Sequence, residues 1–160
     1  MNIFIYAMQM ETESQKYYRN LAGQTENKGL KTIFNMLADE EAKHYRIIEE
    51  MKITIPEKVS DSSLLPDAAV VFKQMADSKS FDFGDEQTEL YQKAQDIETK
   101  SRNFYLQKAD EVEDDDQKGI FRKLAKEEEK HHFLLQNIID FVSRPKTWLE
   151  DAEWYHLEEY

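Results

Sequence analysis

The chain has 160 residues, of which 34% are charged and 40% hydrophobic, and its formal net charge is −12. This length suits one domain with a substantial core, and the acidic balance argues against nucleic acids and anionic membranes as partners. Because the sequence has no cysteine, disulfides, thiolate zinc sites and cysteine-ligated iron centres are excluded from it, and a cytoplasmic location is expected.

Two long helices are predicted in the first third of the chain, over about residues 3–24 and 29–53. In both, apolar or small residues recur at 3-4 spacing, which is the pattern of an amphipathic helix. A short turn near residue 26 separates them. Prolines and serines then interrupt the pattern over about 54–83, and within this crossover residues 66–76 favour one short helix with a proline in its first turn.

Two further long helices are predicted after the crossover. The third opens at Gly84 and continues to about residue 109. The fourth follows the acidic cluster 113–116, which supplies an N-cap and a favourable charge, and Pro145 stops it soon after residue 142. The sequence therefore indicates an all-α protein with short turns inside each helical hairpin and one long connection between the hairpins.

The second hairpin repeats the first at an offset of 87 residues, with no gap over about fifty positions. Shared helical composition would not produce identity at acids, tyrosines and histidines on the buried stripe. We therefore predict a duplicated hairpin that forms one bundle over residues 1–144, followed by a C-terminal extension, 145–160, that packs on the bundle or on a partner subunit. The repeated polar pairs are Glu11 and Glu98, Tyr18 and Tyr105, Glu41 and Glu128, and His44 and His131.

Acids and imidazoles on the buried stripes are predicted to meet at one height in the bundle. In each hairpin the two acids lie fifteen residues on either side of the turn, and each second helix carries a Glu-x-x-His, a same-face pair. Burying unpaired carboxylates would cost several kcal/mol each, whereas two divalent cations would balance four of them. Oxygen and imidazole ligands suit iron or manganese. The predicted metal-binding set is Glu11, Glu41, His44, Glu98, Glu128 and His131.

This arrangement resembles the ferritin-like di-metal carboxylate bundles, in which two helices each give a Glu and the other two each give a Glu-x-x-His. Tyr18 and Tyr105, seven residues after the first-helix and third-helix acids, narrow the resemblance to the rubrerythrins. Both tyrosines are expected to hydrogen-bond ligand carboxylates. The resemblance implies terminal ligands Glu11 with His44 and Glu98 with His131, and bridging ligands Glu41 and Glu128.

The rubrerythrin resemblance implies two iron ions per chain, with manganese or a mixed pair as alternatives. The expected activity is reduction of hydrogen peroxide or dioxygen. Because the chain lacks the four cysteines of a rubredoxin domain, electrons are expected from a separate rubredoxin-like protein, and a homodimer or higher homo-oligomer is expected.

One departure from the family pattern leaves alternatives open. Ser101 stands where typical rubrerythrins have an additional Glu, and Ser14 matches it in the first half. The six-ligand set that remains is similar to the centre of bacterioferritin. An iron-oxidising storage protein and a metal-binding protein without turnover are therefore the other hypotheses.

Other acids and histidines are given weaker interpretations. Glu129 and His132 share the three-residue spacing but lie one step off the apolar stripe, so they are expected to face solvent. Glu40 and Glu127 precede the two bridging acids, and surface charge is favoured over a role in orienting the imidazoles. His156 has no evident partner in the sequence.

Overall fold

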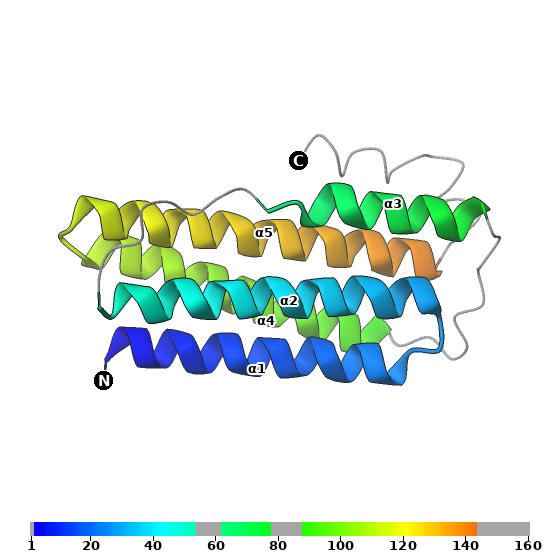
Figure 1. Cartoon of the computed structure of the whole chain (residues 1–160), viewed down its shortest axis with the longest axis horizontal. Coiled ribbons are helices and arrows are strands. Elements are labelled where there is room, and N and C mark those ends of the chain that lie inside the picture. The colour runs from blue at the N-terminus through cyan, green and yellow to red at the C-terminus, as the bar shows by residue number, and fades with distance from the viewer. Residues whose placement is uncertain (1, 54–61, 78–87, 144–160) are drawn as a thin grey trace.

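The computed structural model describes residues 2–53, 62–77 and 88–143, and five helices account for most of this part of the chain. Four long helices lie side by side as a bundle, and one shorter helix lies against one end of it (Figure 1). The predicted all-α class is confirmed. The helices are α1 (Ile3–Gln24), α2 (Lys28–Met51), α3 (Leu64–Asp77), α4 (Thr88–Glu111) and α5 (Asp115–Ser143).

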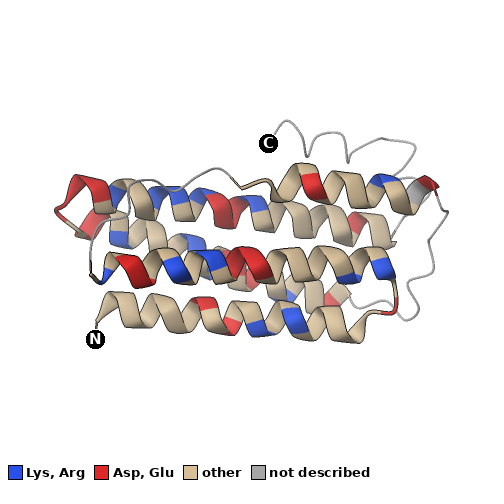
Figure 2. Ribbon diagram, in the orientation of Figure 1, with Lys and Arg blue, Asp and Glu red and all other residues tan. Residues whose placement is uncertain are grey.

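Side-chain caps start the helices close to the predicted positions. The Oδ1 atom of Asn27 accepts a hydrogen bond from the Leu30 amide at 3.0 Å at the start of α2. At the start of α5, Asp114 Oδ1 accepts from the Gln117 amide at 2.9 Å, so the expected N-cap in the acidic cluster is confirmed. Figure 2 shows this acidic turn at one end of the bundle. The negative charge there also favours the α5 N-terminus through the helix dipole.

The two hairpins share details of their turns as well as their stripes. Lys31 Nζ in α2 donates to the Ala22 carbonyl near the end of α1 at 2.8 Å. Shifted by 87 residues, Lys118 Nζ in α5 donates to the Ala109 carbonyl near the end of α4 at 3.2 Å. Each lysine thus satisfies a carbonyl that the end of the preceding helix leaves without an intrahelical partner. The agreement supports a duplicated hairpin.

The short helix predicted in the crossover is present as α3, with Pro66 in its first turn. It packs against one end of the bundle through Phe72, whose ring lies edge-on to Phe141 of α5 with centroids 5.5 Å apart. A Cβ at Gly29 of α2 would lie 2.3 Å from Met75 Sδ of α3, so glycine permits this close packing. The rest of the crossover, the predicted extension 145–160 and His156 lie outside the described residues.

The apolar core of the bundle consists of two clusters with polar residues between them. The larger cluster includes Tyr18, Leu37 and Leu135 and extends to α3. The smaller includes Ile48 and Phe121 and lies towards the N-terminus of α1. Between the two clusters, the buried side chains of every long helix include acids or imidazoles in place of apolar groups. None of the described helices combines the length and hydropathy needed to cross a bilayer.

Candidate metal centre

All six residues predicted to bind metal meet in the middle of the bundle, and each is at most 2% exposed. They form two groups whose candidate ligand atoms all lie within 4.8 Å of one another. Glu41 and Glu128 belong to both groups, so they occupy the position between two candidate metal sites. The first group is Glu11, Glu41, His44 and Glu128, and the second is Glu41, Glu98, Glu128 and His131.

The two imidazoles direct the same ring atom at the acids. His44 Nδ1 lies 2.7 Å from Glu128 Oε1, and His131 Nδ1 lies 2.7 Å from Glu41 Oε1. Both contacts cross from one hairpin to the other. The rings are parallel, with an interplanar angle of 1° and centroids 5.5 Å apart. The repeat of the two hairpins thus appears at the site as a local two-fold pseudosymmetry, down to individual atoms.

Two buried tyrosines hold the remaining acids, and again each crosses between hairpins. Tyr18 in α1 donates its hydroxyl hydrogen to Glu98 in α4, and Tyr105 in α4 donates to Glu11 in α1. Burial raises the pKa of both phenols well above the usual value of 10, and the charges of nearby carboxylates raise it further. The tyrosines therefore remain protonated donors at neutral pH.

Burial and proximity give the four carboxyl groups different pKa values. Desolvation raises the pKa of Glu41 and of Glu128 well above the usual range, and the charges of the other acids raise it further. Burial acts in the same direction on Glu98, but the charge of His131 and hydrogen bonds from its neighbours outweigh it and lower the Glu98 pKa to about 2. Burial would also raise the pKa of Glu11, but interactions with Glu41, His44 and Tyr105 outweigh it and lower that pKa. Without a cation, the site thus relies on retained protons for charge balance.

Whether these residues fit a metal can be judged from the hydrogen bonding of their carboxylate oxygens. The Oε2 atoms of all four acids in the cluster, and that of Glu127 outside it, are buried and have no hydrogen-bond partner within the described part of the chain. An unsatisfied buried acceptor costs about 1–3 kcal/mol, and more when it is charged. A cation satisfies such an oxygen without needing a proton, so the cluster fits a di-metal site. The four atoms belong to Glu11, Glu41, Glu98 and Glu128.

The interpretation of Glu40 and Glu127 as surface charge is wrong. They are only 7% and 2% exposed, because α2 and α5 pack on more than the single stripe that the 3-4 spacing defines. Each is accompanied by the lysine three residues later: Glu40 Oε1 lies 3.2 Å from Lys43 Nζ, and Glu127 Oε1 lies 3.3 Å from Lys130 Nζ. The sequence signal for this burial was that the same Glu–Lys pair occurs in both halves of the chain.

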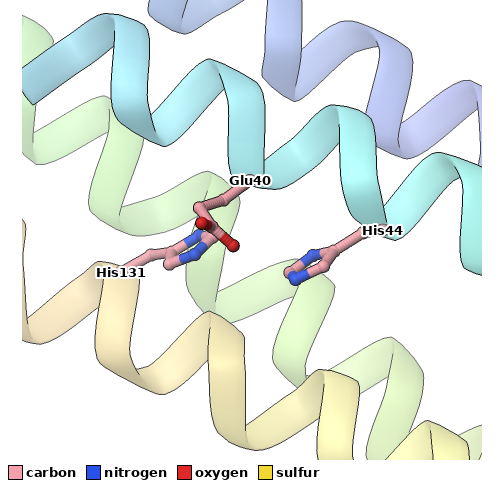
Figure 3. Close-up of side chains that lie close together, drawn as sticks. All are labelled: Glu40, His44 and His131. Atoms are coloured by element: carbon pink, nitrogen blue, oxygen red, sulfur yellow. The ribbon is translucent and has the colours of Figure 1, made fainter. Parts of the chain in front are cut away.

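Glu40 also lies close to the imidazoles. Its carboxylate and the ring nitrogens of His44 and His131 form a third group within 4.8 Å. Figure 3 shows Glu40 reaching from α2 towards the His131 ring on α5. His131 Nε2 is buried and has no hydrogen-bond partner in the described residues, so a small movement of Glu40 would supply an acceptor for it.

The sequence also matches a known family over most of its length. A family model described as Rubrerythrin matches residues 2–139. The chain belongs to the rubrerythrin family. Comparison with curated proteins and with solved structures gives no significant match.

The family match covers all five helices up to residue 139 and therefore all six residues of the cluster. Ser101, which stands where typical rubrerythrins have a further Glu, is 1% exposed and lies one turn after Glu98. Its counterpart Ser14 is equally buried and donates to the Met10 carbonyl at 3.0 Å. This member of the rubrerythrin family thus has a symmetric set of four acids and two histidines.

Proposed function

We propose that the chain is a non-haem di-iron oxidoreductase that reduces hydrogen peroxide or dioxygen, with electrons from a separate donor protein, and so protects the cytoplasm from oxidants. The observation that carries the proposal is the pair of buried four-residue groups that share Glu41 and Glu128. Family membership supports it. One iron (or manganese) ion would be held by Glu11 and His44, the other by Glu98 and His131, and both would be bridged by Glu41 and Glu128.

The protein's part in this reaction is to position and insulate the metals. Bound iron supplies the electron transfer to the oxidant; two electrons and two protons convert one hydrogen peroxide into two waters. Tyr18 and Tyr105 fix the orientation of Glu98 and Glu11 by donating hydrogen bonds across the bundle. Apolar clusters on both sides of the site limit access of bulk water. Donor sets of this kind leave coordination positions open for an oxidant.

Metal analysis and stopped-flow spectroscopy test the proposal directly. The protein as purified and reloaded with Fe²⁺ should contain two metals per chain, and its reduced form should be oxidised faster by hydrogen peroxide than by dioxygen. Glu128→Ala should lose bound metal, whereas Glu49→Ala, an exposed acid on α2, should not. Failure to bind metal, or equal metal content in the two variants, would contradict the assignment.

Iron oxidation with storage is the second candidate, and the symmetry of the site favours it. Because Ser101 stands in place of the further carboxylate and matches Ser14 in the first half, the six residues that remain are equivalent between the halves. Storage requires a hollow shell of many subunits, whereas an oxidoreductase requires only a small homo-oligomer. Gel filtration of the iron-loaded protein separates these alternatives, and accumulation of more than two irons per chain would favour storage.

A further inference from the structure

A pocket between α4 and α5 ends at the proposed metal site. Its volume is about 290 Å³. Glu98 and Glu128 form part of its wall, yet both are only 1% exposed, so their carboxylates close it from the site. The outer wall includes Thr99, Arg102, Glu129 and His132. Glu129 and His132, expected to face solvent, are partly exposed, and the Glu129 side chain is 42% exposed.

Another pocket, beside the first hairpin, does not reach the residues of the metal site. It has a volume of about 350 Å³ and lies between α1 and α2, and its wall includes Thr12 and Tyr45, the counterparts of Thr99 and His132. That wall includes neither Glu11 nor Glu41. The larger side chain of Tyr45 stands where the second half has an imidazole. Of these two pockets, the one between α4 and α5 is lined by residues of the site and the one between α1 and α2 is not.

The lining of the α4–α5 pocket suits a small uncharged polar molecule. Arg102 Nη1 and Glu129 Oε1 lie 3.9 Å apart, so opposite charges at the mouth offset each other. Neither Glu129 nor His132 belongs to a group of described residues that could hold a metal ion. Hydroxyl and imidazole groups of Thr99 and His132 provide donors and acceptors, and one water needs only about 30 Å³ of liquid volume.

We propose that this pocket is the antechamber in which small uncharged polar molecules, hydrogen peroxide above all, are held before they reach the metals. The inference rests on the proposed function, since it assumes a metal-loaded site. Glu98 and Glu128 form the inner barrier, and rotation of either carboxylate opens the last step. Thr99 and His132 set the width of the approach, so access occurs through the second hairpin and not the first.

Binding of nitric oxide to the Fe²⁺-loaded protein tests this inference without turnover, because the probe is small and uncharged and its ferrous adduct absorbs visible light. Thr99→Phe and His132→Tyr should each lower the association rate about tenfold, because binding must then wait for the side chain to move. The matched control Thr12→Phe fills the closed pocket of the first hairpin and should leave the rate unchanged. Metal content should stay the same in all three variants.

The reciprocal variant Tyr45→His keeps the inference testable if a filled pocket prevents folding. It introduces the second-half residue into the first half and should raise the nitric oxide association rate. Unchanged rates in Thr99→Phe and His132→Tyr would overturn the antechamber, as would equal slowing in Thr12→Phe. Slower Fe²⁺ loading with unchanged nitric oxide binding would instead identify the pocket as a route for cations, and this result would also overturn the proposal. A wild-type protein that binds no iron would refute the proposed function itself.

Discussion

Glu41→Gln should make the metal-free protein more stable while weakening its response to metal. Glu41 Oε1 contacts His131 Nδ1 at 2.7 Å, and the amide oxygen of Gln can keep this contact. The amide NH₂ is a donor beside Glu11, which has a carboxylate oxygen within 4.8 Å of one of Glu41. The substitution thus replaces a buried ionisable group and an unsatisfied oxygen without leaving a cavity.

The expected gain follows from the cost of one unsatisfied buried acceptor, about 1–3 kcal/mol. At about 2–4 °C per kcal/mol for a chain of this size, the melting temperature in EDTA should rise by about 2–12 °C. The gain should grow as pH rises, because the wild-type carboxyl group must then ionise inside the core. Glu50→Gln, an exposed acid on the same helix, should change the melting temperature little.

Metal binding should reverse this order, so that wild type becomes more stable than Glu41→Gln. A ligand that binds only the folded state stabilises it according to its affinity, and Gln is a weaker ligand than a bridging carboxylate. Thermal unfolding of both proteins in EDTA and in excess Mn²⁺ measures the two effects together. A Glu41→Gln protein that melts below wild type in EDTA would refute the reasoning, since it would show that the carboxylate stabilises the fold without metal.

Three further outcomes are expected. Because folding raises the pKa of Glu41 and Glu128, the contribution of these two groups to the stability of the metal-free protein should be full below the ordinary carboxyl pKa of about 4.3 and be lost as pH rises through the raised values, as urea denaturation would show for wild type against Glu41→Gln. Metal loading should release protons to an indicator dye. An equal pH dependence of the two proteins, with no proton release, would contradict this. Tyr18→Phe and Tyr105→Phe should each lower metal affinity about 10–100-fold in chelator competition, and unchanged affinity would show that the hydroxyl hydrogen bonds do not support the ligands. Phe72→Ala should lower the free energy of unfolding by about 3–5 kcal/mol in denaturant titrations while metal stoichiometry stays unchanged; a loss of metal would mean that α3 supports the site.

The sequence predicted the helices and the six-residue cluster because both depend on local spacing. A 3-4 repeat of apolar residues defines one buried face wherever the partner helix lies. Glu41 and His44 share that face because they are three residues apart on one helix. The repeat at 87 residues then placed the second pair at the same height as the first. None of these steps needs knowledge of how the hairpins pack.

Features that depend on packing between helices were beyond sequence reasoning. Glu40 and Glu127 are buried although they lie outside the apolar stripes of α2 and α5. The position of α3 follows from contacts such as Phe72 with Phe141, which are distant in sequence. The pocket beside His132 depends on a side-chain size difference between the halves, which the repeat by itself does not reveal.

The residues proposed to bind metal also fix how the hairpins align. Apolar stripes alone would tolerate a shift of one hairpin along the other by one helical turn, about 5.4 Å, because the 3-4 pattern nearly repeats after each turn. Such a shift would break all four crossing contacts at once: Tyr18 with Glu98, Tyr105 with Glu11, and each imidazole with the opposite bridging acid. Each broken contact would leave a buried polar group without a partner, and the four costs together are comparable to the typical stability of a domain. The polar centre therefore costs stability when it lacks metal, yet it also selects the one register in which two metals can be held.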